Sequence, residues 1–168
     1  MRRRLLTAAA TMVSCAVVFA GGAAAPAFAA TTHHEVHVSG TAHIKDDEWR
    51  HDDIGNHKLA RQTLRLPTDG FIHWTPCQGR EVTANFEVHA KLITGDPKKV
   101  GWARVHASLW LLEGVSCNSH DVDAKKAIDI DVPPNGEVTQ SLTAVTGERN
   151  SEDYATVTFK VEHDLVND

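Results

Sequence analysis

The stretch that decides the fold is residues 80–112, which read REVTANFEVHAKLITGDPKKVGWARVHASLWLL. Apolar and polar side chains alternate with a period of two on both sides of Gly95-Asp96-Pro97-Lys98. This period is typical of half-buried strands, because successive side chains of a strand point to opposite faces. Glycine, aspartate and proline together are typical of a tight turn. The stretch therefore predicts a long β-hairpin with one apolar face and one polar face.

The position of the turn sets the expected pairing of the two strands. A turn at residues 95–98 places Val88 opposite Val105 on the apolar face. A slip by one residue would expose every apolar side chain to water, so the choice of inward-facing residues is firmly set. The same register brings Cys77 beside Cys117, and we expect these two cysteines to form a disulfide at the open end of the hairpin.

The same alternation continues through the rest of the chain, and no segment shows a sustained helical period. Further strands are expected at residues 35–44, 59–66, 71–74, 124–132, 137–145 and 153–163. Residues 45–58 (KDDEWRHDDIGNHK) are polar and acidic, and they predict a long loop. About eight half-apolar strands predict an all-β fold, an antiparallel two-sheet sandwich of the immunoglobulin-like or jelly-roll type. Residues 30–168 would form this single domain.

The first 29 residues have the three-part layout of a secretory signal peptide. Arg2, Arg3 and Arg4 are positive, residues 5–20 are apolar, and small residues lead to Ala29. The apolar run is shorter than a membrane span requires, and no charged stop-transfer segment follows it. We expect cleavage after Ala29, secretion of the remainder to the extracellular space, and no membrane anchor after cleavage.

The composition argues against several classes of partner. The chain has 168 residues, with 17 Lys and Arg against 22 Asp and Glu, and its formal net charge is −5. Loss of the three leader arginines would change this charge to −8. A net negative surface argues against nucleic acid and anionic membranes as partners. The two cysteines that remain in an exported domain favour one disulfide over a structural zinc site.

The outward face of the hairpin is the main candidate binding surface. The expected register places Lys91 opposite Trp102, His89 opposite Arg104, Glu87 opposite His106, and Thr83 opposite Trp110. A tryptophan can stack on a sugar ring while neighbouring charged groups supply hydrogen bonds. The candidate ligand-binding residues are Glu87, His89, Trp102, Arg104, His106 and Trp110. The alternative is that the N-terminal strand or the acidic loop covers this face, which would make the tryptophans part of the core.

Five carboxylates within eight residues are a candidate cation site. They are Asp46, Asp47, Glu48, Asp52 and Asp53. Hard cations such as Ca²⁺ take several oxygen ligands, but this spacing differs from that of the helix–loop–helix calcium site. The 11 histidines leave adventitious Zn²⁺ or Cu²⁺ binding as a related alternative. We therefore assign no metal site from the sequence and expect no cofactor.

No sequence pattern points to catalysis. Residues 114–118 (GVSCN) lack the second glycine of a nucleophile elbow, and the chain has no phosphate-binding glycine loop. We therefore expect a secreted, non-enzymatic binding or cell-envelope protein whose partner is an extracellular polysaccharide or another protein. A metal-binding protein is the first alternative. A protease inhibitor that presents residues 74–80 (WTPCQGR) is the second.

Overall fold

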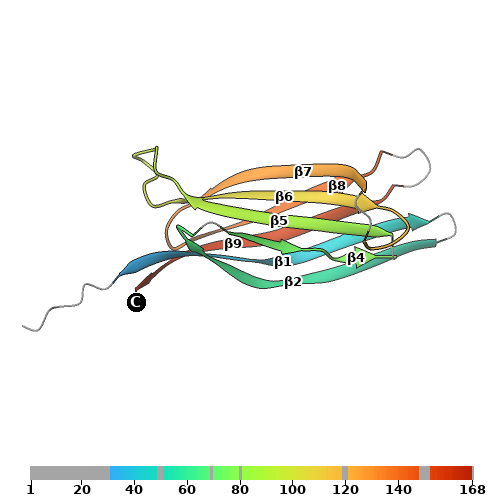
Figure 1. Cartoon of the computed structure of the whole chain (residues 1–168), viewed down its shortest axis with the longest axis horizontal. Coiled ribbons are helices and arrows are strands. Elements are labelled where there is room, and N and C mark those ends of the chain that lie inside the picture. Colours follow the sequence, from blue (N-terminus) through green and yellow to red (C-terminus); the bar gives the residue numbers. More distant parts are fainter. Residues whose placement is uncertain are drawn as a thin grey trace, which may run out of the picture.

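The alternation seen in the sequence forms two antiparallel sheets that lie one over the other (Figure 1). The computed structural model describes residues 31–48, 51–68, 70–79, 81–118, 121–147 and 152–167. The expected signal peptide lies outside these residues. Within the described ranges, no helix has the length and apolar character needed to cross a bilayer.

Nine strands are present in the described residues, and together they make the expected β-sandwich. They are β1 (Thr32–Glu48), β2 (His51–Leu66), β3 (Phe71–Trp74), β4 (Cys77–Gln78), β5 (Val82–Leu92), β6 (Ala103–Glu113), β7 (Asp121–Val132), β8 (Gly136–Val145) and β9 (Tyr154–Asn167). Sheet A has the order β2-β1-β9-β8. Sheet B has the order β3-β5-β6-β7, with β4 also paired to β5. The sequence predicted eight strands, and the two-residue β4 is the additional one.

One connection and one strand pairing explain this topology. The chain passes from sheet B to sheet A at Pro133–Gly136, where the Gly136 N–H donates to the Pro133 carbonyl at 3.0 Å. Asn135 has a φ of 55° in this turn, a left-handed conformation that asparagine tolerates better than most residues. The first and last strands then pair along almost their whole length, with Thr32 opposite Asn167.

The core lies between the two inner faces and is almost entirely apolar. Its largest fully buried side chains include Ile44, Leu59, Leu66, Phe86, Leu109, Leu111 and Phe159. The ring centroids of Phe86 in sheet B and Phe159 in sheet A are 4.9 Å apart. Trp74 stacks on the other side of Phe86 with a centroid distance of 5.7 Å. These aromatic contacts join the two layers near the middle of the sandwich.

The prediction of a loop over residues 45–58 is wrong, because β1 and β2 extend through this segment. A β-bulge also interrupts the ladder just beyond this segment. Val38 pairs with Gln62 and Gly40 pairs with Leu59, so two residues of β2 lie opposite the single residue Ser39. The extra residue reverses which side chains of β2 face inward. Within residues 51–58 the inward positions of β2 are Asp53, Gly55 and His57, none of which carries an apolar side chain, and this hides the alternation.

The predicted register of the long hairpin is wrong by two residues, although the inward-facing set is correct. Val88 lies opposite Ala107 rather than opposite Val105. The reason is the longer loop, which is closed by a hydrogen bond from the Ile93 N–H to the Trp102 carbonyl at 2.8 Å. A shift of two residues preserves the faces of the strands, because the side-chain period is also two.

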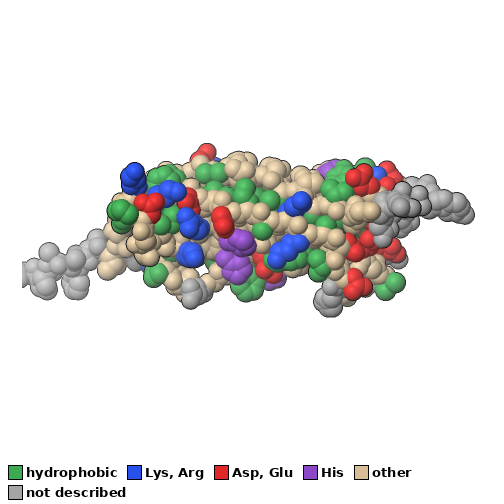
Figure 2. Space-filling model, turned by 90° about the horizontal axis from the view of Figure 1, so that it is seen from above, with side chains coloured by type: hydrophobic (Ala, Val, Ile, Leu, Met, Phe, Trp, Pro, Cys, Tyr) green, Lys and Arg blue, Asp and Glu red, His purple; other side chains and the backbone are tan. Residues whose placement is uncertain are grey.

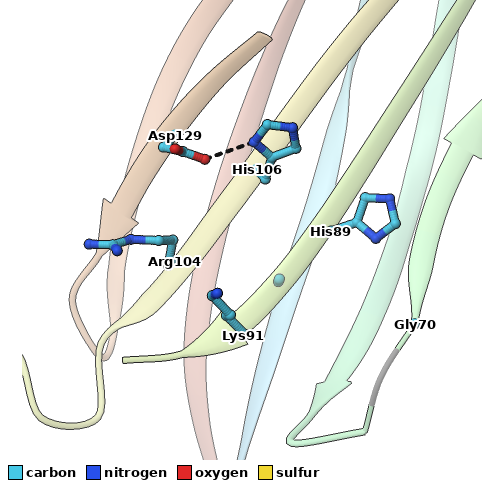
Figure 3. Close-up of a pocket in the computed structure, with 7 residues that line it drawn as sticks. Gly70, His89, Lys91, Arg104, His106 and Asp129 are labelled. Carbon is cyan, nitrogen blue, oxygen red and sulfur yellow. Dashed lines mark hydrogen bonds and ion pairs between the residues drawn. The ribbon is translucent and has the colours of Figure 1, made fainter. Parts of the chain in front are cut away.

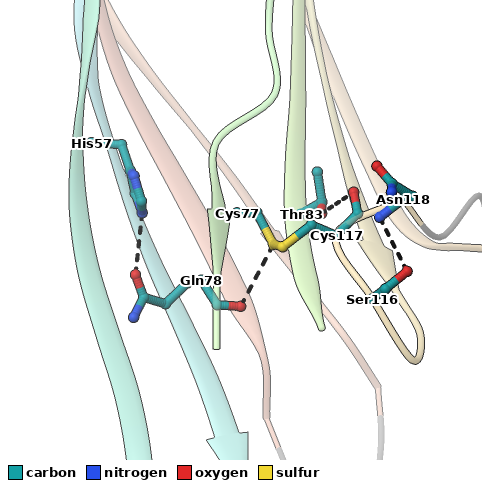
Figure 4. Close-up of a disulfide and its surroundings, with 7 residues drawn as sticks. All are labelled: His57, Cys77, Gln78, Thr83, Ser116, Cys117 and Asn118. Carbon is teal, nitrogen blue, oxygen red and sulfur yellow. Dashed lines mark hydrogen bonds between the residues drawn. A yellow bond between two sulfur atoms is a disulfide. The ribbon is translucent and has the colours of Figure 1, made fainter. Parts of the chain in front are cut away.

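The predicted disulfide between Cys77 and Cys117 is present, and it closes the open end of this hairpin (Figure 4). Cys77 belongs to β4, where it pairs with Thr83 of β5. The Thr83 hydroxyl donates to the Cys117 carbonyl at 3.2 Å, which holds the segment after β6 beside β5. The disulfide therefore joins β4, at the edge of sheet B, to the segment that follows β6.

A buried histidine ties the two sheets together at the other end. His163 of β9 is 0% exposed, and its Nδ1–H donates to the Val132 carbonyl at the end of β7, at 3.1 Å. Its Nε2 consequently accepts from Nδ1–H of His34, at 2.9 Å. Burial, followed by the neighbouring His163 and His33, lowers the pKa of His34. In this hydrogen-bond chain Nδ1 of each ring carries the hydrogen, and Nε2 of His163 is the acceptor.

Replacing both Cys77 and Cys117 with Ala should lower the free energy of unfolding by about 4 kcal/mol, because the bond closes a 40-residue loop and so restricts the unfolded chain. Urea denaturation at neutral pH measures this change. Dithiothreitol should lower the midpoint of the parent protein and leave the double variant unchanged. Equal midpoints for the parent with and without reductant would contradict the prediction.

Acid should destabilise the fold through His34. Its pKa is lower in the folded chain than the ordinary 6.5, so the unfolded chain binds more protons and the free energy of unfolding falls as the pH drops below that value. We expect the thermal midpoint to decrease between neutral pH and pH 5 by less in His34→Gln, which keeps an N–H donor for His163. His89→Gln, at an exposed position, is the matched control. Identical pH dependence in the parent and His34→Gln would show that His34 is not responsible.

Candidate functional site

The outer face of sheet B carries most of the side chains selected from the sequence. His89 of β5 and Arg104 and His106 of β6 are exposed. Figure 2 shows histidine side chains grouped with basic and acidic ones on one face of the molecule. Strand β1 and the described residues 45–48 and 51–58 belong to sheet A, so neither lies over the outer face of sheet B. The alternative of a covered face is therefore wrong for the described part of the chain.

The corrected register assembles two rows of side chains across sheet B. The first row is Phe71, His89, His106 and Asp129, on β3, β5, β6 and β7. The second row is Lys91, Arg104 and Asp131. The pairs expected from the sequence, His89 with Arg104 and Glu87 with His106, are not formed. Instead His89 lies opposite His106 and Glu87 lies opposite Ser108. Arg104 lies opposite Lys91, so two cations are neighbours.

A hollow of about 510 Å³ lies between these rows (Figure 3). Its lining residues are Gly70, His89, Ala90, Lys91, Arg104, His106 and Asp129. We call this hollow the histidine–cation pocket. It contains three of the six residues proposed from the sequence, namely His89, Arg104 and His106. Glu87, Trp102 and Trp110 lie on the same sheet but outside the lining.

Asp131 fixes the orientation of Arg104. The guanidinium donates through Nε to Oδ1 at 2.8 Å and through Nη2 to Oδ2 at 3.0 Å, and Lys99 donates to Oδ2 at 2.6 Å. These hydrogen bonds lower the pKa of Asp131 far below its ordinary value and raise the pKa of Arg104. A bidentate contact of this kind holds the guanidinium in one plane. Its remaining N–H groups are left for a ligand.

Lys91 is the least restrained charge in the pocket. Its side chain is exposed, and within the described residues it has no ion-pair partner. It lies opposite Arg104 in the ladder, so two permanent cations are neighbours at this point. Adjacent like charges on paired strands are unfavourable without a counter-ion. Asp131 is already the counter-ion of Arg104, so Lys91 is the cation that favours an additional anionic group here.

His106 is held by a hydrogen-bond chain whose order is that of a Ser-His-Asp triad. Its Nδ1 lies 2.8 Å from Asp129 Oδ1, and its Nε2 lies 3.0 Å from Ser108 Oγ. Since an ionised carboxylate only accepts, Nδ1 carries the proton and Nε2 accepts from the serine hydroxyl. Ser108, however, is 2% exposed, so a substrate carbonyl cannot reach its Oγ without displacing the strand. The two hydrogen bonds fix the orientation of the His106 ring, which lines the pocket.

The two tryptophans do not form one platform. Trp102 immediately precedes β6 and Trp110 lies near its other end, and eight residues of strand span about 26 Å. Lys99 Nζ lies 5.8 Å from the ring centroid of Trp102, and Lys125 Nζ lies 4.6 Å from that of Trp110. Each indole thus packs under a lysine of its own, as a separate cation–π pair.

The carboxylates proposed for a cation lie at the end of the β1–β2 hairpin. Asp46 pairs with Asp53, Asp47 with Asp52, and Glu48 with His51 along the ladder. Lys45 Nζ lies 3.1 Å from Asp47 and 3.4 Å from Asp52, so a lysine already supplies positive charge there. Within the described ranges, no group of three or more His, Cys, Asp or Glu side chains has the geometry to hold a metal ion.

The segment proposed for protease inhibition is a strand connection as far as the structure describes it. The Ala84 N–H donates to the Pro76 carbonyl at 2.9 Å, and Cys77 and Gln78 pair with β5. Arg80, the last residue of that proposed strip, lies outside the described residues. This part of the chain follows the edge of sheet B closely from Trp74 to Gln78.

Four functional side chains of the site were not among the six candidates selected from the sequence, namely Phe71, Lys91, Asp129 and Asp131. Alternation in residues 124–132 does place both aspartates on an outward face. Without the strand order, nothing in the sequence placed that strand beside Arg104 and His106. Phe71 follows a turn and lies in a four-residue strand, where no periodicity marks it as exposed.

Comparisons with known protein families, curated proteins and solved structures returned no match for this chain. The function must therefore be inferred from the chemistry of the site itself.

The hydrogen-bond chain predicts the tautomer of His106. At a pH where the ring is neutral, nitrogen-15 NMR should show the proton on Nδ1, because Asp129 accepts from that atom. In Asp129→Ala the acceptor is absent, and we expect the Nε2–H tautomer to gain population. Asp123→Ala, on the same strand and also exposed, should leave the His106 spectrum unchanged. A proton on Nε2 in the parent protein would contradict the assignment.

Proposed function

We propose that this protein is a secreted, non-enzymatic binding protein whose histidine–cation pocket recognises an acidic extracellular polysaccharide. The observation that carries the proposal is the pairing of Lys91 with Arg104 at the wall of an open pocket on a sheet face. The alternatives of a dedicated metal site and of a protease inhibitor gain no supporting contact from the described residues.

The anionic part of the ligand is matched by Lys91 and Arg104. Arg104 is held flat by Asp131, and a planar guanidinium with free N–H groups suits a carboxylate. Lys91 adds a mobile ammonium on the neighbouring strand. Hydrogen bonds between charged partners are about twice as strong as neutral ones, so a carboxylate would gain most from this position.

The sugar part of the ligand is matched by Phe71 and His89. Phe71 is 55% exposed, and its ring stacks on the His89 ring with centroids 5.5 Å apart and planes 28° from parallel. An exposed aromatic face next to hydrogen-bonding groups suits the apolar face of a pyranose. The first row of the site thus replaces the tryptophan platform expected from the sequence.

The overall charge limits how densely charged the ligand can be. The chain carries a formal charge of −5, and the surface around the pocket includes Glu87, Asp129 and Asp131. Such a surface repels nucleic acids and heavily sulfated polymers at long range. A polysaccharide with one carboxylate per two sugars carries fewer charges than those polymers. The acidic surface therefore repels it less, while its carboxylates can still bind Lys91 and Arg104.

A hyaluronan hexasaccharide, which carries one glucuronate per disaccharide, is a suitable probe. NMR titration should shift the ring protons of His89 and Phe71, whereas a neutral chitin hexasaccharide should not shift them. Lys91→Gln and Arg104→Gln should each weaken binding by about tenfold, because each removes one charged hydrogen bond.

Lys126→Gln is the matched control, since it removes an exposed lysine of the same sheet at a position outside the pocket. It should bind as the parent does. Equal shifts with both oligosaccharides, or unchanged affinity in Lys91→Gln and Arg104→Gln, would overturn the proposal. Shifts confined to the Trp102 and Trp110 indoles would favour the tryptophan face instead.

A further inference from the structure

Strand β8 is the edge of sheet A, and within the described residues it pairs only with β9. The backbone N–H and C=O groups on its other side therefore have no ladder partner among the described strands. An open edge of this kind is a template for another strand, and natural sheets usually protect it with charges, proline or a short length. Strand β8 has ten residues, from Gly136 to Val145.

The other edges of the two sheets carry such protection, whereas β8 has a single charged residue, Glu137, at its start. Strand β2 contains Asp52, Asp53, Lys58, Arg61 and Arg65, and β7 contains the adjacent Lys125 and Lys126. Strand β3 has only four residues. In contrast, residues 138–145 read VTQSLTAV and contain neither a charge nor a proline. Among the long described edges, this one is the most suited to pairing.

The outer face of β8 already forms hydroxyl pairs with its neighbour. Ser141 Oγ lies 2.8 Å from Thr158 Oγ1, and Thr143 Oγ1 lies 2.9 Å from Thr156 Oγ1. All four are side chains of directly opposed residues in the β8–β9 ladder. Serine and threonine hydroxyls both donate and accept, so the same strand can make similar pairs on its open side.

We propose that β8 pairs antiparallel with β8 of a second copy of this chain, about a two-fold axis at Ser141. This register places Thr139 opposite Thr143 on the outer face and Val138 opposite Ala144 on the inner face. Glu137, the only charged residue of β8, falls opposite Val145, so no like charges meet. The partner is a second copy because this register places hydroxyl opposite hydroxyl along the outer face and Val138 opposite Ala144 on the inner face. Gln140 then lies opposite Leu142, and its amide is the one uncharged polar group that faces an apolar side chain.

The two-fold axis would be perpendicular to the sheet, since antiparallel neighbours keep the same face outward. Sheet A would continue through both copies, and the outer faces of the two B sheets would point in the same direction. If the histidine–cation pocket binds a polysaccharide, as proposed above, the dimer presents two pockets to one polymer. Simultaneous binding would raise the apparent affinity without any new contact.

The test is the mass of the purified protein in solution, measured by light scattering after size-exclusion chromatography over a dilution series. We expect twice the mass of one chain at high concentration. Ser141→Lys should reduce the mass to that of one chain, because two ammonium groups would face each other across the axis. The side chain is exposed, and circular dichroism should confirm an unchanged fold.

Gln62→Lys is the matched control, because it adds the same charge at an exposed position of β2, the other edge of sheet A. It should remain a dimer. A parent protein of single-chain mass at the highest soluble concentration would overturn the proposal. So would a dimer that persists in Ser141→Lys or that is lost in Gln62→Lys. Amide hydrogen exchange at residues 138–144, slower at high than at low concentration, gives independent support.

Discussion

The contact between Phe86 and Phe159 is the interaction on which the rest of the structure depends. The two rings come from different sheets, and they set the separation of the layers at the centre of the core. Truncation of a buried phenylalanine costs about 3–5 kcal/mol, a large part of the stability of a domain of this size. Because one face of each sheet is committed to this core, the opposite face is free for polar groups. The histidine–cation pocket exists on that free face.

The period of two made most of the fold predictable from the sequence. It identified the strands, their inward-facing residues and the all-β sandwich, and the spacing of Cys77 and Cys117 identified the disulfide. The bulge opposite Ser39 could not be foreseen, since an inserted residue reverses the alternation that the prediction uses. The predicted register of the hairpin was wrong because the loop is longer than the four-residue turn that the sequence suggested. It is closed by the hydrogen bond between Ile93 and Trp102, and its residue types do not reveal where a loop closes.

The candidate site was harder to predict than the fold, because it depends on which strands are neighbours. His89, Arg104 and His106 were selected from one hairpin, where sequence order and spatial order agree. Asp129 and Asp131 come from β7, and the charges they place beside His106 and Arg104 follow only from the strand order. A register shift of two residues left every outward side chain outward. The shift nevertheless changed the residue that lies opposite each side chain on the neighbouring strand. These cross-strand neighbours determine which charges and hydrogen-bonding groups meet in the pocket.

The pairing of the first strand with the last has a consequence for how the chain acquires its structure. In the ladder, Thr32 meets Asn167 and Lys45 meets Tyr154, so the central pair of sheet A joins segments more than a hundred residues apart. A ribosome makes β1 before β9, with the strands of sheet B synthesised between them. Until then β1 has only β2 beside it, and sheet A cannot close over the core. Sheet A can therefore be completed only after β9 has been synthesised, and such non-local pairing is slow.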